Sequence, residues 1–154
     1  MAYLRVRSSN HSLARFPLGN ILQIQSKSSQ TEATVENTNF EDITADWSLT
    51  ITPSSTSNKI FIMWTYSAYN NTANQHYIHT LLRDSSNLGN STFGFGSIHV
   101  ASASNISPVV GQYLDSPSTT SAVTYKVQHR VTGGTGVAIV NSPVGSITVM
   151  EVAQ

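Results

Sequence analysis

Side chains alternate along residues 59–69, and this pattern constrains the fold more than any other feature of the chain. One side of the stretch carries Ile60, Ile62, Trp64, Tyr66 and Ala68. The other side also carries large apolar side chains, at Phe61, Met63 and Tyr69. Because successive side chains of a β-strand point to opposite faces, the stretch predicts a strand that is central in its sheet or covered on both sides. Such a strand favours burial of one face in a contact between subunits.

Further segments of the same character follow one another with turn sequences between them. They span residues 21–25, 47–51, 76–83, 97–102, 107–113, 123–131, 137–140 and 147–152. Segment 123–131 alternates most clearly and predicts a half-buried strand with a polar outer face. No segment has helical periodicity, and turn signals recur at roughly ten-residue spacing. The pattern predicts an all-β fold, an antiparallel β-sandwich of the jelly-roll type.

Charge divides the chain into a short N-terminal arm, residues 1–19, and a domain, residues 20–154. Arg5, Arg7 and Arg15 lie in the arm, and no acidic residue precedes Glu32. We interpret the arm as a docking segment whose three arginines pair with acidic groups on another protein; a frayed, solvated terminus is the alternative. The 154-residue chain has zero formal net charge, and only 10% of its residues are charged. This composition excludes a globally basic nucleic-acid-binding protein.

Several classes of site are excluded by residues that the sequence lacks. It has no cysteine, which excludes disulfides, thiolate metal centres and thiol catalysis. It has no apolar run of about 18 residues, so we expect no membrane insertion, and its first residues do not form a secretory signal. His76 and His79 are three residues apart, which places them on opposite faces of a strand. We therefore expect no metal site and no cofactor, unless histidines of symmetry-related copies meet on an axis.

No catalytic motif is present, and we expect the protein not to be an enzyme. The sequence has no G-x-S-x-G motif. The acidic run 41–46 predicts a solvated loop, and Asp84 and Asp115 lie in turn sequences where a carboxylate caps backbone N–H groups. A glycosidase would need two carboxylates facing a groove, and nothing in the sequence indicates such a pair. The glycine-rich stretch 133–136 predicts a hairpin turn rather than a phosphate loop.

Aromatic and amide side chains gather around two turn regions, residues 69–77 and 84–96. Flat rings and amides suit the faces and hydroxyls of sugars, and also neutral protein surfaces. We therefore expect candidate receptor or glycan contacts here; the alternative is that the rings belong to the core and the amides form turns. The candidate residues are Tyr69, Asn70, Asn71, Asn74, Tyr77, Phe93 and Phe95.

Six short motifs, taken in order, resemble a known family. They lie at residues 19–24, 51–60, 81–84, 113–117, 124–128 and 146–152. Together they resemble small virion structural proteins of marine and cyanobacterial phages, of the tail-fibre-like type, and the resemblance covers residues 19–154. It implies a jelly-roll domain that forms a homotrimer on the exterior of a virus particle. The family has no catalytic signature to carry over.

From the residues and the resemblance we expect a non-enzymatic phage virion structural protein. Its trimeric knob would belong to a fibre or tail and contact a host surface glycan, while the arm would bind a tail, baseplate or capsid protein. The chain has no shaft repeats or heptads, so a complete long fibre is not expected. A capsid decoration (cement) protein of the same fold and a carbohydrate-active depolymerase are the alternatives. No partnership with nucleic acid is expected.

Overall fold

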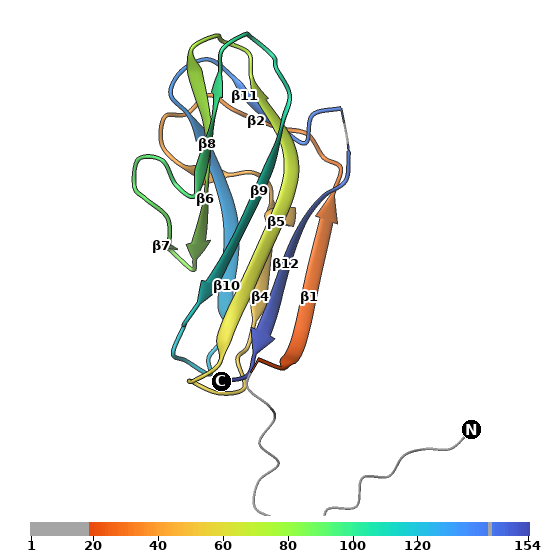
Figure 1. Ribbon diagram of the computed structural model, residues 1–154, viewed down its shortest axis with the longest axis vertical. Helices are drawn as coiled ribbons and strands as arrows, with labels where there is room; N and C mark the ends of the chain where they lie inside the picture. The colour runs from red at the N-terminus through yellow and green to blue at the C-terminus, as the bar shows by residue number, and fades with distance from the viewer. Residues whose placement is uncertain (1–18, 142) are drawn as a thin grey trace, which may run out of the picture.

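The chain folds into two antiparallel β-sheets packed face to face (Figure 1). The computed structural model describes residues 19–141 and 143–154. The strands are β1 (Ile21–Ser29), β2 (Ala33–Val35), β3 (Glu41–Asp42), β4 (Ser48–Ile51), β5 (Lys59–Asn70), β6 (Gln75–Arg83), β7 (Ser86–Asn87), β8 (Gly96–Val100), β9 (Ser107–Asp115), β10 (Val123–Val131), β11 (Gly136–Ala138) and β12 (Gly145–Val152). One turn of 3₁₀ helix, η1 (Ala45–Trp47), precedes β4. The predicted all-β fold is confirmed.

The first sheet has β5 at its centre. One side of β5 pairs with β9, and the other side pairs first with β12 and then with β11. Beyond these, β1 pairs with β12 and β2 pairs with β11. The sheet is therefore four strands wide, with β11 and β2 continuing the rows that β12 and β1 begin.

The second sheet is built in the same way around β10 and β6. The two pair with each other; β3 and β4 lie on the far side of β10, and β7 and β8 lie on the far side of β6. If β1–β2, β3–β4, β7–β8 and β11–β12 are each counted as one interrupted strand, the domain has eight strands, numbered 1 to 8 along the chain. In this numbering the two sheets have the strand orders 1-8-3-6 and 2-7-4-5. Each sheet thus alternates early and late strands, which is the double Greek-key connectivity of a jelly roll.

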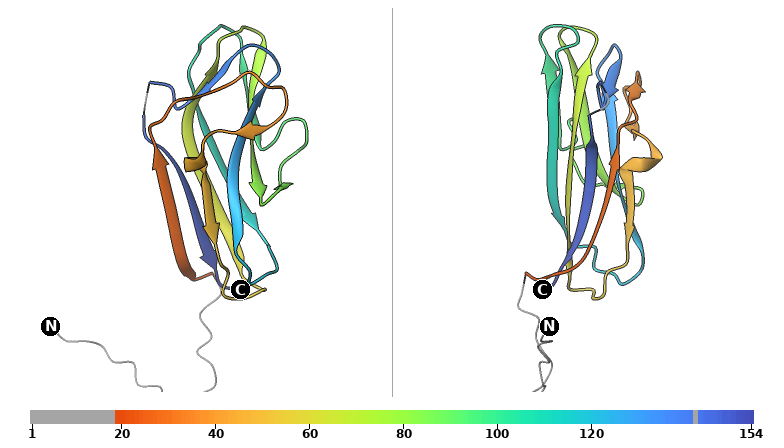
Figure 2. Two further views of the ribbon diagram at one scale, coloured as in Figure 1. Left: turned by 180° about the vertical axis from the view of Figure 1, so that it is seen from behind. Right: turned by 90° about the vertical axis from the view of Figure 1, so that its right-hand side faces the viewer.

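The core lies between the two sheets, where the inward residues of both interdigitate. The bulkiest buried side chains are Trp47, Trp64, Tyr77 and Tyr125. Burial alternates at every position of β10, as the sequence predicts for a strand with one polar face. The edge-on view in Figure 2 shows the two layers.

Strand β5 is central, as predicted, and the described residues pack a second sheet against only one of its faces. Ile60, Ile62 and Trp64 are buried against the second sheet. Met63, on the outward face, is 42% exposed. No second layer of the described chain therefore packs on the outward apolar face of β5, although Phe61 and Tyr69 on it are half-buried.

Several local predictions need correction. Strands β2, β3 and β7 were not predicted, because two- and three-residue strands are too short to show alternation. The stretch 133–136 is not a hairpin turn: it carries the chain from β10 in the second sheet to β11 in the first. Asp115 does not cap a turn. It ends β9, where its carboxylate accepts from Arg83 (3.0 Å) and from the hydroxyl of Tyr125 (2.6 Å).

The two ends of the sandwich carry different parts of the chain (Figure 1). Gly19 N donates to Ala153 O and Ala153 N donates to Asn20 O, both at 2.9 Å, so the start of the described chain lies beside its C-terminal end. The loop 52–58 lies at this same end, and the loops 71–74 and 101–106 lie at the opposite one. Residues 1–18, with Arg5, Arg7 and Arg15, lie outside the described residues.

Candidate interaction surfaces

Two of the predicted contact residues are buried and do not belong to a surface. Tyr77 is fully buried in the core, where its hydroxyl donates to the Tyr66 hydroxyl (3.4 Å) and is hydrogen-bonded to His129 Nδ1 (2.8 Å). Asn70 is also fully buried. Its side-chain N–H donates to Gly133 O, and its side-chain oxygen accepts from the backbone N–H of Thr72, both at 2.9 Å. These two predictions are corrected: one residue is core and the other holds the β5–β6 turn.

The other five predicted contact residues do not form one surface but lie at the β5–β6 turn, in the loop before β8 and against the core. Asn71 and Asn74 are exposed at the β5–β6 turn, and Tyr69 is half-buried near the end of β5. Phe93 is 51% exposed in the loop before β8, and its ring lies 6.1 Å from that of His76. Phe95 packs edge-on against Trp64 and Tyr113, with ring centroids 5.5 and 5.1 Å away.

Asparagine side chains fix the exposed turns. Asn71 Oδ1 accepts from the backbone N–H of Thr135 (2.9 Å), which ties the β5–β6 turn to the β10–β11 connection. Asn90 Oδ1 accepts from the N–H groups of Thr92 and Phe93 at 2.8 and 2.9 Å. Asn71, a predicted ligand contact, therefore also acts as a turn former, as does Asn90, which was not predicted to contact a ligand.

The outward face of the first sheet carries a continuous apolar row. The register places Ile24 opposite Met150, Met150 opposite Phe61, and Phe61 opposite Leu114, across all four strands of the sheet. The neighbouring cross-strand rows on this face, toward Thr65 and Val110, also carry no charged side chain. We call this surface the neutral face: Ile24, Ser26, Phe61, Met63, Thr65, Val110, Gln112, Leu114, Ser146, Thr148 and Met150. Lys59, at its border, is the one charged residue at an outward position of β1, β5, β9 and β12.

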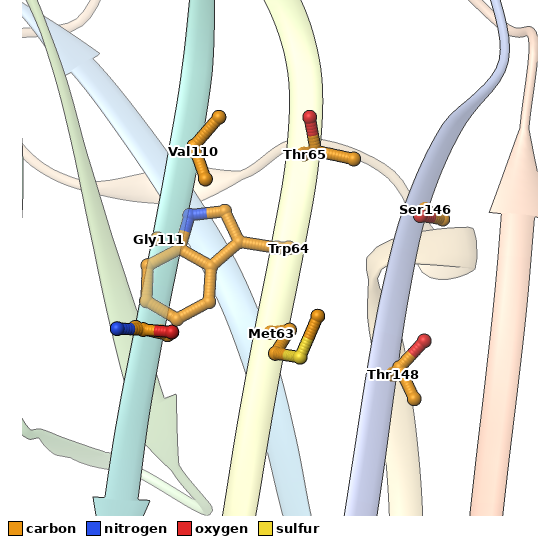
Figure 3. Close-up of a pocket in the computed structure, with 8 residues that line it drawn as sticks. Met63, Trp64, Thr65, Val110, Gly111, Ser146 and Thr148 are labelled. Carbon is orange, nitrogen blue, oxygen red and sulfur yellow. The ribbon is translucent and has the colours of Figure 1, made fainter.

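A shallow depression of about 250 Å³ lies within the neutral face (Figure 3). Met63 and Val110 supply apolar parts of its lining, and the hydroxyls of Thr65, Ser146 and Thr148 supply polar parts. Val110, which is 69% exposed, projects beside it. A projecting side chain and a hollow thus occur on the same uncharged surface.

The outer face of the second sheet is different because it carries charges. Lys126 Nζ lies 3.0 Å from Asp42, and Gln128 donates to the same carboxylate. Burial alone would raise the pKa of Asp42, but these hydrogen bonds outweigh it and hold the pKa below its usual range. Arg130 lies over the ring of Phe40, 5.3 Å from its centre. Of the two sheets, only the first presents a broad neutral surface.

The buried carboxylates have structural partners. Glu151 accepts from Gln23 (2.6 Å), from Asn58 (2.6 Å) and from both the backbone and side chain of Ser54, and so anchors the loop 52–58. Burial would raise the pKa of Glu151, but these hydrogen bonds keep it below the usual range. The carboxylates of Glu151 and Asp115 are therefore engaged in hydrogen bonds that hold the fold together.

The histidines are arranged partly as predicted. His76 and His79 point to opposite faces of β6, and His79 Nδ1 accepts from Trp64 Nε1 (3.2 Å) inside the core. His99 was not among the residues singled out from the sequence, but the β6–β8 register places it directly opposite His76. Only strand pairing could reveal this, because 22 residues separate the two in the sequence. The described part of the chain holds no cluster of three or more metal-ligating residues, and no helix in it is long and apolar enough to span a membrane.

Comparison with known proteins gives little similarity. No protein-family model matches the chain, and no curated protein matches it. Among solved structures, a chain in the structure of infectious bursal disease virus, Gx strain, aligns with a TM-score of 0.39 and 9% sequence identity. The alignment covers 87% of this chain and 38% of that one, so this chain spans well under half of its length.

Proposed function

We propose that this protein is a non-enzymatic structural protein of a phage particle, displayed on the exterior as a fibre or tail component. Its jelly-roll domain assembles as a homotrimer, and the neutral face provides the contact between copies. The observation that carries this proposal is the apolar row Ile24–Met150–Phe61–Leu114, which the described chain leaves uncovered.

The distribution of exposed apolar side chains supports a contact on this sheet. Nine large hydrophobic residues are exposed among those described, and six of them lie on β1, β5 or β9. These six are Ile21, Leu22, Ile24, Met63, Val110 and Leu114. Contiguous exposed apolar patches on a soluble domain mark interaction sites. The concentration on one sheet therefore favours a partner that covers that sheet.

The size and neutrality of the face support a second copy as that partner. Four strands spaced about 4.8 Å apart, each rising about 3.4 Å per residue over the nine residues of β9, give a projected area of roughly 590 Å². In a trimer each copy would divide this face between its two neighbours, so the three copies together would bury roughly 1,800 Å² of surface. Identical uncharged surfaces do not repel each other, and the projecting Val110 lies beside a hollow that a neighbour's side chain could fill.

The start of the described chain and the exposed loops lie at opposite ends of the domain, and this arrangement supports display of the loops on the particle surface. Residues 1–19 would attach to a tail, baseplate or capsid protein through Arg5, Arg7 and Arg15. The start of the described chain lies at the end opposite to the loops 71–74 and 101–106. Attachment at one end would thus turn the exposed Asn71 and Asn74 outward, toward a host surface glycan. Tyr69 and Phe93 would contribute from the flanks.

The assembly is tested with a matched pair of substitutions in the full chain. Leu114, on the neutral face, is 47% exposed; Ile106, outside it, is 46% exposed. Leu114→Glu should convert the trimer to monomers in native mass spectrometry, because it buries a charge between copies. Ile106→Glu should leave the trimer intact. A wild-type monomer at micromolar concentration would overturn self-assembly, and an intact Leu114→Glu trimer would place the contact elsewhere.

The place on the particle is tested by gold labelling with an antibody to the domain. Label at the tail or at fibre ends would support an attachment component. Label spread over the head would replace this function with that of a capsid decoration protein, and absence from all particles would overturn the virion proposal. Release of reducing sugar from host polysaccharide would contradict the non-enzymatic part of the proposal and favour a depolymerase.

A further inference from the structure

His76 of β6 and His99 of β8 form a cross-strand pair on the outer face of the second sheet. The backbone N–H of His76 donates to Thr132 Oγ1 (2.9 Å), and its carbonyl accepts from Thr132 N (3.2 Å). Both backbone groups therefore point away from β8. In an antiparallel ladder this defines a non-hydrogen-bonded pair, the position where opposing side chains lie closest.

The two imidazole rings are spaced as two ligands of one ion would be. Their centroids are 4.9 Å apart and their planes are inclined by 57°. Zn²⁺ binds imidazole nitrogen at about 2.0–2.1 Å, and two rings bound at a tetrahedral angle have centres roughly 5 Å apart. The observed spacing meets this requirement without movement of either strand.

The chemical state of the pair also favours a ligand. His76 Nδ1 is buried and has no hydrogen-bond partner, whereas buried polar atoms are nearly always satisfied. His76 itself is only partly exposed and its backbone is held by Thr132, while His99 is exposed. One ligand is thus pre-positioned, and the open side beside His99 leaves room for water to complete the coordination shell.

We propose that His76 and His99 bind one divalent transition-metal ion of the class that imidazole prefers, such as Zn²⁺. The ion would join β6 to β8 through their side chains. These strands lead into the turn 71–74 and the loop 101–106, so the site would brace the loops farthest from the start of the described chain. The inference concerns a single copy of the domain and does not depend on the proposed virion role.

The test uses the full, untagged chain titrated with Zn²⁺ in a calorimeter. The wild type should bind one ion per chain. His99→Asn, at an exposed position that should tolerate substitution, should weaken binding at least tenfold, and His76→Asn should do the same. His11→Asn is the matched control, because it removes a histidine of the N-terminal segment and should leave the affinity unchanged.

Thermal unfolding provides a readout that does not rely on heat of binding. An ion that binds only the folded chain raises its unfolding temperature. Zn²⁺ should therefore raise the Tm of the wild type and of His11→Asn, but not that of His99→Asn. The proposal is overturned if the wild type binds no Zn²⁺ at micromolar concentration, if His99→Asn binds as tightly as the wild type, or if His11→Asn abolishes binding.

Discussion

At the scale of single residues, two histidines buried in the core make the stability of this domain sensitive to pH. His79 on β6 and His129 on β10 are direct cross-strand partners, and both face the interior. Burial lowers the pKa of each to about 4; for His129 the charge of Asp42 opposes the shift without cancelling it. His79 Nδ1 also accepts the Trp64 indole N–H, a bond that protonation of this nitrogen would remove. Both imidazoles are therefore neutral in the folded chain near pH 7.

We predict that the domain loses stability as the pH falls from about 6.5 toward 4. The unfolded chain binds protons on these histidines near pH 6.5, whereas the folded chain does not bind them until the pH is near 4. The stabilisation is thus fully present above pH 6.5 and decreases below it. Between pH 7.5 and 5 the free energy of unfolding should fall by about 2 kcal/mol per histidine. Urea unfolding at the two pH values, at one protein concentration, measures this loss.

The control is the same measurement on His79→Gln and His129→Gln. Each variant is expected to be less stable than the wild type at pH 7.5, but its free energy of unfolding should change less with pH. The carboxylates with lowered pKa values, Asp42 and Glu151, lose their contribution only at lower pH, so they do not obscure this window. An unchanged pH dependence in both variants would contradict the assignment.

Residue-level predictions from sequence succeeded where they depended on local geometry. The opposite orientation of His76 and His79 follows from strand parity. Asp84 does accept from a backbone N–H as expected, but the donor is Thr124 on β10 rather than a residue of its own turn. Predictions failed where register decided the outcome. Tyr77 closely follows the exposed turn 71–74 in the sequence, yet the packing of the two sheets places its side chain in the core.

At the scale of strands, the pairing of β5 with β9 depends on one glycine. Gly111 lies opposite Trp64, and a Cβ built on it would be 2.0 Å from Trp64 Cζ2. The indole therefore occupies the space that any other side chain at position 111 would fill. This glycine is required for close approach.

We predict that Gly111→Ala destabilises the domain by about 1–3 kcal/mol, because the added methyl group must displace the indole or the strand. The midpoint of urea unfolding should fall with little change in the slope of the transition. Ser97→Ala, at an exposed position of β8 outside the neutral face, should change the free energy of unfolding by less than about 0.5 kcal/mol. Equal effects of the two substitutions would refute a steric role for Gly111.

The long strands were predictable from sequence, and their connections were not. Strands β5, β6 and β10 are long enough for alternation to be visible, and their predicted bounds agree with the structure within one residue. The partner of each strand depends on contacts between distant segments. The glycine-rich stretch 133–136 has the residues of a hairpin turn, yet it crosses between sheets, because β11 finds its partners in β5 and β2.

At the scale of the whole molecule, the two outer faces differ in charge, and this difference predicts how association responds to salt. Contacts through the neutral face would be apolar, so Debye screening should affect them little. We predict that raising NaCl from 50 mM to 1 M changes the dissociation constant of the proposed homotrimer less than about threefold. Sedimentation equilibrium measures this constant directly.

Attachment through the arginines of residues 1–19 should respond in the opposite way. Ion pairs between exposed groups weaken as salt rises, so binding to a virion partner should fall several-fold over the same range. Trimer dissociation at 1 M NaCl would show that ion pairs, rather than the neutral face, hold the copies together.

The bonds at residue 19 have a mechanical consequence. The backbones of Gly19 and Asn20 are hydrogen-bonded to that of Ala153. From there β1 runs antiparallel to β12 along the length of the domain. Hydrogen bonds between antiparallel strands lie perpendicular to the strand direction. A pull on residue 19 along β1 therefore loads the β1–β12 bonds together, in shear, rather than opening them one at a time. We therefore expect the domain to resist tension best along its long axis, the direction in which a bound host would pull on it in the proposed attachment role.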